Sequence, residues 1–290
     1  MIIALNVLNM NWMGKTMETA KQKNDIKTFN VYIKDNEVSE KISRGIIYNL
    51  TKKGLGVSEK PDIVICIGGD GTFLRAIDHY KDRLDEVLFC GVHTGTLGFL
   101  TDFKVDQIPQ LLDSISGREY FVEKAQMLRT KIFHDDGVAE YLSLNEGRIE
   151  NNLTTLVLDV YVDNNHFETF RGNGLNFCTS TGSTGYNKSL GGAIVHPRVE
   201  GFQMCEIASI NNREYRPLGS SFVFNTRHTV TLLIRDGEGL IFGYDTKAVE
   251  LEKTFKGVRK IQFGIAEETV RFIRFVHKPF SQRVKRNFIK

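Results

Sequence analysis

The chain has 290 residues, of which 41% are hydrophobic and 10% are aromatic. This content is enough for one large or two smaller packed domains and excludes an intrinsically disordered protein. The formal net charge is only +3, too small to indicate a protein that binds nucleic acid. Because the sequence has no apolar run of about 18 residues and no cleavable signal, we expect a soluble, cytoplasmic protein without a membrane partner.

The four cysteines are widely spaced, and no pair has the spacing of metal ligands. Cys66 and Cys90 lie inside apolar, strand-like segments. We therefore expect all four, with Cys178 and Cys205, to be reduced core thiols of a cytosolic protein. The seven histidines form no paired helical metal motif either, so the sequence assigns no metal ligand.

The first part of the chain alternates segments typical of strands with segments typical of helices. Strands are expected at 2–7, 63–67 and 87–92, and helices around 42–50, 73–80 and 105–115. Repeated β-α units with short connections predict a parallel sheet covered by helices. We place this α/β domain at residues 1–118. Ligands of such folds bind at the carboxyl ends of the strands.

From about residue 119, short β-rich stretches separated by turns replace that pattern. They lie at 129–134, 155–162, 230–235, 240–244 and 259–263. This spacing predicts a second, mainly antiparallel, β-rich domain at 119–278. The segment 279–290 is expected to form a helix, because Phe280, Val284 and Phe288 recur every four residues. We expect this last helix to return to the first domain and complete it.

The most informative motif is Gly68-Gly69-Asp70-Gly71-Thr72, directly after the strand at 63–67. Glycines between a strand and a helix bring backbone N–H groups against a phosphate. An ordinary tight turn would explain two of the glycines but not the whole set. Asp70 is the unusual member, because an anion is unfavourable beside phosphates. It needs a reason to be there, such as holding a metal ion or taking a proton from the attacking hydroxyl.

Three further segments carry groups that suit a nucleotide. Residues 91–102 form a strand-to-loop junction whose Phe99 either stacks on a base or belongs to the core. The pair Asn145-Glu146 can read donors and acceptors of a ribose or base, although such a pair is also ordinary on a surface turn. Residues 179–192 interleave glycine with serine and threonine around Tyr186. This composition suits phosphates and nucleotide hydroxyls unless the segment is a plain low-complexity loop.

One apparent motif is excluded. Gly14-Lys15-Thr16 looks like the end of a phosphate-binding P-loop, but the position of that motif's first glycine is Asn9, and the intervening residues are bulky. The glycines at 91, 95 and 98 likewise lack the spacing of a dinucleotide fingerprint.

Taken together, the four segments, in this order and spacing, resemble the NAD kinase family, whose members phosphorylate the adenosine ribose 2′-hydroxyl of NAD to give NADP. The likeness extends from about residue 63 to the C-terminus and includes Phe170-Arg171-Gly172, His196-Pro197 and 208–213. It implies an α/β domain plus a β-rich domain, with the last helix back on the first. It also implies ATP as co-substrate (polyphosphate in some members), Mg²⁺, and a homotetramer or dimer that shares pocket residues across subunits.

The resemblance also assigns roles position by position. Asp70 matches the family's general base, and Gly68, Gly69 and Gly71 match its phosphate-facing turn. The positions matching the nucleotide pocket are Phe99, Asn145, Glu146, Asn173, Thr184, Gly185, Tyr186, Ser189 and Asp245. Mg²⁺ is expected to be held mainly by the ATP phosphates.

Some positions depart from the family pattern. Asn173 stands where many bacterial members have an Asp that contacts the nucleotide, and Gly185 stands where an Ala is usual. The other departures are Ser180, Thr246 and Gly147-Arg148, the last of which puts a cation near Glu146. These differences bear on substrate preference, including NAD against NADH, rather than on the reaction type.

Two alternatives come from other classes of protein. One is a catalytically altered NAD(P)-binding protein, against which the intact Asp70 and its glycines argue. The other is a related lipid kinase, whose family shares the Gly-Gly-Asp-Gly turn. Asn145-Glu146 and residues 184–189 favour the dinucleotide, and no amphipathic membrane-binding stretch is evident. We expect NAD to lie between the two domains, with its 2′-hydroxyl near Asp70.

Overall fold

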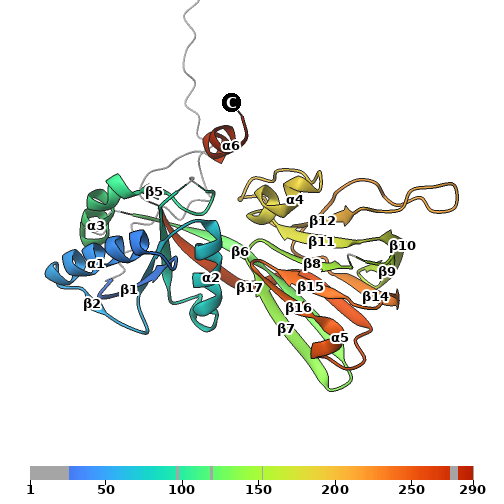
Figure 1. Cartoon of the computed structure of the whole chain (residues 1–290). Helices are drawn as coiled ribbons and strands as arrows, with labels where there is room; N and C mark the ends of the chain where they lie inside the picture. The colour runs from blue at the N-terminus through green and yellow to red at the C-terminus, as the bar shows by residue number, and fades with distance from the viewer. Residues whose placement is uncertain (1–25, 96–97, 118–119, 152, 275–279, 290) are drawn as a thin grey trace, which may run out of the picture.

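The structure is a computed structural model that describes residues 26–95, 98–117, 120–151, 153–274 and 280–289. Figure 1 shows two adjoining parts, with helix α6 above them. The strand expected at 2–7 and the excluded Gly14-Lys15-Thr16 motif lie outside the described residues. The four cysteines are buried and free, as expected. Within the described ranges, no helix is long and apolar enough to cross a membrane.

The first part is a parallel sheet with helices on both faces. Strand β3 (Ile63–Ile67) pairs in parallel with β1 (Thr28–Ile33) and β4 (Leu88–His93), and β2 (Gly56–Val57) extends β1. Val64 and Cys66 of β3 pack with α2 (Asp70–His79) on one face. The alternate residues of β3 pack with α1 (Glu37–Lys52) and α3 (Ile108–Gly117) on the other. Both faces are therefore dry, which is why β3 is apolar throughout, and the expected α/β domain is confirmed.

Three elements differ from the sequence-based expectations. Strand β1 is absent from the sequence-based expectations, although four of its six residues are hydrophobic; only Phe29 among them is fully buried. Helix α2 begins at Asp70, three residues earlier than expected, because Gly69 adopts the extended conformation of an N-cap. Helix α3 is preceded by a 3₁₀ turn at Val105–Gln107, so the expected single helix consists of two pieces.

The second part consists of two packed β-sheets. One is a six-stranded antiparallel sheet with the order β13 (Phe222–Phe224), β12 (Phe202–Ile207), β11 (Gly174–Thr179), β8 (Glu146–Glu150), β15 (Ile241–Tyr244) and β16 (Lys247–Glu250). Facing it are β10 (Asn165–Gly172), β9 (Leu156–Val162), β14 (Val230–Asp236), β17 (Lys260–Arg274), β6 (Phe121–His134) and β7 (Gly137–Ser143). Between the layers, the rings of Phe177 and Phe263 stack with centroids 4.0 Å apart. The expected antiparallel, β-rich domain is confirmed.

Strand β17 joins the two parts into one continuous sheet. Its first residues pair antiparallel with β14, whereas Arg271 and Phe272 near its end pair parallel with β4. The sequence predicted only 259–263 of this strand, because Glu267 and Glu268 interrupt the strand pattern. The register against β6 shifts at the same place, between Ile265 and Thr269. The expected domain boundary at 118–119 lies outside the described residues, between α3 and β6. We propose that the two domains divide at that point of the chain. Strand β17 of the second domain nevertheless pairs with β4 of the first.

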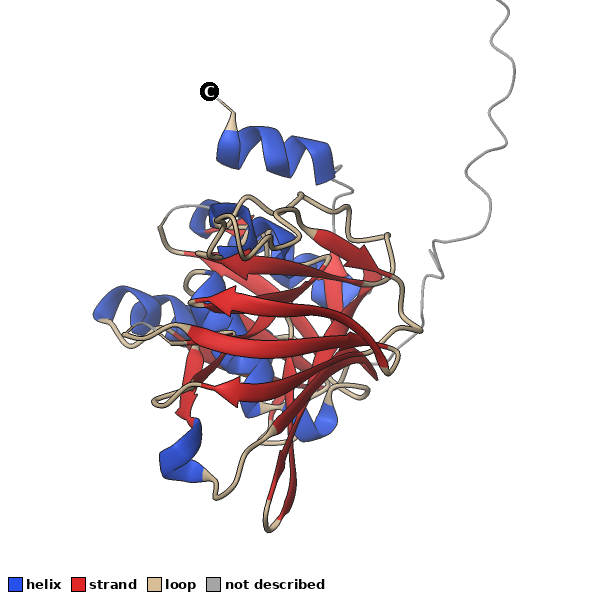
Figure 2. Ribbon diagram, turned by 90° about the vertical axis from the view of Figure 1, so that its right-hand side faces the viewer, coloured by secondary structure: helices blue, strands red, loops and turns tan. Residues whose placement is uncertain are grey.

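The C-terminal helix α6 (Phe280–Phe288) touches both parts. Arg283 Nη1 donates to the carbonyl oxygen of Phe99 at 3.2 Å, and the rings of Phe288 and Phe99 are 5.2 Å apart. On the other side, the ring of Phe280 lies 5.2 Å from that of His196. In Figures 1 and 2 the helix lies across the same edge of the molecule as the short helix α4 (Tyr186–Ser189). The last helix therefore returns to the first domain, as expected, and bridges to the second.

The stacked rings between the two sheets provide a test of this core. Phe263→Ala should lower the free energy of unfolding by about 3–5 kcal/mol, because it removes a fully buried ring and leaves a cavity. Urea unfolding followed by circular dichroism measures this change. The matched control is Tyr48→Ala on α1, since Tyr48 is 60% exposed and its loss should cost less than about 0.5 kcal/mol. Equal midpoints for the two variants would contradict this packing.

Candidate functional site

Asp70 is the first residue of α2 and lies at the carboxyl end of β3. Its Oδ2 accepts a hydrogen bond from the backbone N–H of Phe99 at 2.8 Å, and its Oδ1 accepts one from Leu100 at 3.1 Å. A Cβ added at Gly98 would overlap the carboxyl group, so only glycine permits this close approach. The carboxylate thus fixes the loop after β4 against the start of α2.

The glycine turn around Asp70 presents backbone N–H groups at the start of a ten-residue helix. The N–H of Gly68 donates to Val92 O at 2.9 Å, which ties the turn to β4. The first N–H groups of α2 have no intrahelical partner and carry the positive end of the helix dipole. Arg75, one turn later, donates to Thr72 Oγ1 at 3.3 Å. The sequence analysis missed this cation, although its i, i+4 spacing from Gly71 signals a shared helix face.

Asp245 holds the second group of expected site residues. It lies in the turn between β15 and β16 with φ of 44°, and its carboxylate accepts three backbone N–H bonds. Oδ1 accepts from Asn145 at 2.7 Å and Oδ2 from Leu144 at 2.9 Å. Burial raises the pKa of Asp245 to about 6, and these backbone donors oppose the rise. Since both oxygens are engaged, Asp245 shapes the turn that carries Asn145 and Glu146.

The two groups lie side by side although they come from different parts of the chain. Lys247 of β16 forms an ion pair with Asp78 of α2. A Cβ built at Gly71 would lie 3.9 Å from Thr246 Cγ2, an ordinary van der Waals distance. The β15–β16 turn therefore rests against the start of α2, next to the Asp70 turn.

Glu146 is a buried carboxyl group with an unsatisfied oxygen. Its side chain is on the outer face of β8, and the residue is 6% exposed. Oε1 lies 4.0 Å from Arg148 Nη1, while Oε2 has no hydrogen-bond partner among the described residues. Burial raises the pKa of Glu146 to about 8; the charge of Asp245 adds to the rise and that of Arg148 opposes it. Such a group is able to bind a ligand hydroxyl.

The segment 179–192 is ordered rather than a plain loop. Thr179 donates its N–H to Asn145 O at 2.9 Å, which attaches the segment to the Asn145–Glu146 turn. Ser183 and Asn187 are fully buried, and the Asn187 amide donates to Ser183 O at 3.2 Å. The expected contact residues lie on the outer side of this segment; Thr184 and Gly185 are half-buried, and Tyr186 and Ser189 are exposed.

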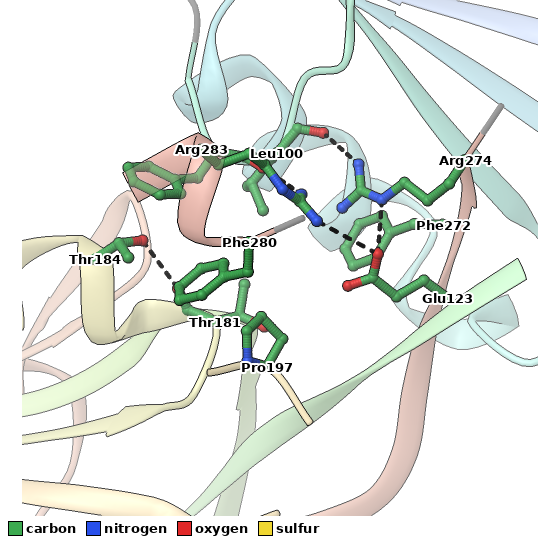
Figure 3. A pocket seen from close by; sticks show the side chains of 10 residues that line it. Leu100, Glu123, Thr181, Thr184, Pro197, Phe272, Arg274, Phe280 and Arg283 are labelled. Carbon is green, nitrogen blue, oxygen red and sulfur yellow. Dashed lines mark hydrogen bonds and ion pairs between the residues drawn. The ribbon is translucent and has the colours of Figure 1, made fainter. Parts of the chain in front are cut away.

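A pocket lies between this segment, the Phe99 loop and helix α6. Figure 3 shows Phe280 pointing toward Thr181, with Arg283 and Arg274 directed to Glu123. Two of the expected site residues, Phe99 and Thr184, line this pocket. The sequence analysis missed the contribution of α6 to this pocket, although the recurrence of Phe280, Val284 and Phe288 along one side of the helix is a signal that could have found it.

Asn173 is the one expected site residue placed away from the rest. It precedes β11, whereas Thr179 ends that strand, so about 20 Å separates the two along the strand. Its amide donates to Asn151 O at 2.8 Å. A single chain therefore does not bring Asn173 to the same pocket.

The described residues contain no group of three His, Cys, Asp or Glu side chains that could hold a metal ion. The donors near Asp70 are backbone N–H groups and a guanidinium, which bind anions. The arrangement fits a metal that arrives on phosphates rather than one held in a protein cage.

Two family models match the chain: the ATP-NAD kinase N-terminal domain at residues 5–120 and the ATP-NAD kinase C-terminal domain at residues 144–275. The NAD kinase of Limosilactobacillus reuteri is 38% identical over 262 residues, which cover 89% of this chain and 97% of that protein. NAD kinase 1 of Bacillus cereus is 42% identical over 233 residues, covering 80% and 86%. The chain therefore belongs to the ATP-NAD kinase family.

Solved structures share the fold. Yeast NADH kinase complexed with NADH has a TM-score of 0.79 at 14% identity, covering 91% of this chain and 87% of that one. An NAD kinase from Archaeoglobus fulgidus in complex with ATP has a TM-score of 0.68 at 23% identity, covering 90% and 97%. Both likenesses support the two-part architecture.

The raised pKa of Glu146 predicts a pH-dependent stability. Between the ordinary glutamate pKa of 4.5 and the raised pKa of about 8, the folded state keeps a proton that the unfolded state has lost. The free energy of unfolding should therefore fall as the pH rises through this window. In Glu146→Gln, the free energy of unfolding should fall less steeply with pH, by up to ~1.4 kcal/mol per pH unit. Urea unfolding at several pH values measures this slope. The exposed control Glu59→Gln should keep the wild-type slope, and an unchanged slope in Glu146→Gln would refute the assignment.

The position of Asn173 gives a second test. Asn173→Asp should lower the free energy of unfolding by about 1–3 kcal/mol, because a carboxylate replaces the amide donor opposite the Asn151 carbonyl. Thermal unfolding at neutral pH measures the loss. Protonation of the new carboxyl restores a donor, so the loss should shrink as the pH approaches about 4. A variant as stable as the wild type would show that this bond contributes nothing.

Proposed function

We propose that this protein is an NAD kinase that transfers the γ-phosphoryl group of ATP to the 2′-hydroxyl of the adenosine ribose of NAD. The observation that carries the proposal is the position of Asp70. This carboxylate begins α2 at the carboxyl end of β3, and the turn that fixes Asn145 and Glu146 rests against the same helix. The proposed base, the N–H groups that would face the phosphates and the polar groups that would face the sugar are thus near one another.

Asp70 would act as the general base. Each of its oxygens accepts one backbone N–H and keeps a further lone pair for a ligand hydroxyl. In the proposed step the ribose oxygen gives its proton to Asp70, forms a bond to the γ-phosphorus, and the bond from phosphorus to the ADP oxygen breaks. Proton transfer of this kind contributes typically ~10²–10⁴-fold. Alignment and charge neutralisation supply most of the remaining acceleration.

The phosphates would lie against the glycine turn Gly68–Gly71, where the N–H groups at the start of α2 and the Arg75 guanidinium supply positive charge. Mg²⁺ enters this proposal as part of the ATP–Mg²⁺ complex and, when bound, neutralises phosphate charge. Polyphosphate would use the same positive groups.

The dinucleotide would lie across Asn145, Glu146 and the segment with Thr184, Gly185 and Tyr186. Asp245 would act through the turn it holds. Phe99 already contacts Phe288, so a base that reaches its ring needs the opposite face or a shift of α6.

We also infer that a second copy of the chain completes the site, in a homodimer or homotetramer. The support is Asn173, which the family pattern puts at the nucleotide and the fold puts at the far end of β11. Ser189 is exposed and available to such a copy. The four free, buried thiols support a reducing, cytoplasmic location.

Replacement of the proposed base gives the central test. Asp70→Asn should lower kcat by at least about 10²-fold, because the amide cannot take a proton, while the Kd for NAD stays within about threefold. NADP formation is measured by a coupled assay with ATP–Mg²⁺, and NAD binding by calorimetry. The matched control Asp82→Asn changes an exposed acid and should leave turnover unchanged.

Near-normal turnover in Asp70→Asn would remove the base assignment. Wild-type protein that binds NAD but forms no NADP would favour the catalytically altered binding protein, and phosphorylation of a diacylglycerol instead would favour the lipid kinase.

A further inference from the structure

Arg148 lies in the middle of β8, on the face that carries the proposed dinucleotide site. Gly147 and Ile149 point into the core, where Ile149 is fully buried and a Cβ at Gly147 would touch Phe263. Alternation along the strand puts Arg148 on the opposite face, in line with Glu146 and Glu150. This is the face over which α4 and Tyr186 lie.

The guanidinium of Arg148 contacts two of the proposed site residues at once. Its Cζ lies 5.3 Å from the ring centre of Tyr186, and its Nη1 lies 4.0 Å from Glu146 Oε1. On its other side, Nε lies 3.2 Å from Glu150 Oε2. The side chain is 22% exposed, so the cation is held between the strand and the Tyr186 ring rather than extended into water.

Gly243 makes room for this arrangement. It is the residue of β15 opposite Arg148, and a Cβ built on it would lie 2.5 Å from Arg148 Cζ. Any larger residue at 243 would push the guanidinium off the sheet. The backbone of β15 and the ring of Tyr186 therefore define one slot for a flat, charged group.

The same slot adjoins polar groups that lack partners. Oε2 of Glu146 has no hydrogen-bond partner among the described residues. Asn176, opposite Arg148 on β11, is fully buried, and within the described ranges neither atom of its amide group has a partner. Buried polar groups without partners are rare in folded proteins and call for an explanation such as a bound ligand or water.

We propose that Arg148 is a positioning residue of the dinucleotide site, which holds the Tyr186 ring and the Glu146 carboxyl group in the orientation that receives the ligand's base and sugar hydroxyls. Gly243 leaves the space that the guanidinium of Arg148 occupies. The proposal rests on the proposed function and adds a residue that acts through its neighbours. Arg148 contacts Glu146, Glu150 and Tyr186, so its effect is expected on substrate binding.

The groups that face Glu146 come from several elements. Arg148 lies on β8, Asp245 lies in the β15–β16 turn, Cys178 lies on β11 and Tyr186 begins α4. Glu150, also on β8, faces Arg148. Arg148 is the cation among these residues and favours the charged carboxylate. Loss of Arg148 should therefore extend the pH range over which Glu146 is protonated.

The experiment compares Arg148→Ala, Arg148→Lys and Gly243→Ala in full-length enzyme. Arg148→Ala should raise the KM for NAD about 5–30-fold with kcat within about threefold and the KM for ATP unchanged. The acidic limb of kcat/KM for NAD should move to higher pH. Arg148→Lys keeps the charge and should restore the pH profile, whereas the KM should recover only in part because an ammonium does not stack flat.

Gly243→Ala is the most discriminating variant, because it displaces the guanidinium while keeping it in the protein. It should raise the KM for NAD in the wild-type background and have no further effect in Arg148→Ala, a non-additivity that reports direct coupling. Arg44→Ala is the matched control, since its side chain is 81% exposed on α1. If Arg148→Ala fails to fold, Gly243→Ala and Arg148→Lys carry the test.

Additive effects of the two substitutions, or a KM and pH profile within twofold of wild type in folded Arg148→Ala, would overturn the proposal. Calorimetry with NAD tests Arg148 independently of turnover. A wild-type protein that binds NAD without forming NADP would therefore refute the kinase proposal and leave this one measurable.

Discussion

Two carboxylates bonded to backbone N–H groups hold the site together. Asp70 accepts from Phe99 and Leu100, and Asp245 accepts from Leu144, Asn145 and Glu146. Each fixes a loop that no regular element would hold. Hydrogen bonds to a charged acceptor are about twice as strong as neutral ones. The same bonds favour the charged form of Asp245 in a place where burial disfavours it.

This arrangement explains how an acid can lie beside the proposed phosphate-binding turn. Asp70 is oriented by the backbone N–H groups of Phe99 and Leu100. Its orientation therefore does not depend on another side chain that a nucleotide would displace. Asp245 likewise fixes the backbone of Asn145 and Glu146, the pair proposed to bind the sugar. The ion pair between Lys247 and Asp78 then holds the β15–β16 turn against α2 and brings the two groups together.

Helix α6 adds a constraint from the far end of the chain. Arg283 binds the carbonyl oxygen of Phe99, the residue whose N–H binds Asp70. The helix therefore acts on the loop next to the proposed base, as well as lining the pocket with Phe280. Access of a base to Phe99 and the position of α6 are linked for this reason.

Much of the fold and part of the site follow from local sequence. The buried strand at 63–67 is recognisable because its five residues are all apolar, and the glycine turn is recognisable because three glycines surround an acid. The late half of β17 escaped prediction, since its pairing partner β4 is about 180 residues away and its own sequence is broken by Glu267 and Glu268. Strand β1 was also not predicted, and its pairing with β2 and β3 is likewise a contact between segments distant in the chain.

By itself, the sequence determined the fold class of both domains and the chemical types at the site: an acid among glycines, an amide beside a carboxyl group, and hydroxyls around a tyrosine. These depend on residue identity and on spacing of a few residues. Only the tertiary structure decided that Asp245 serves the backbone, that Arg148 lies flat on Gly243, and that Asn173 is remote from the pocket within one chain. Those outcomes depend on which strands pair, and pairing is a long-range property that no short segment encodes.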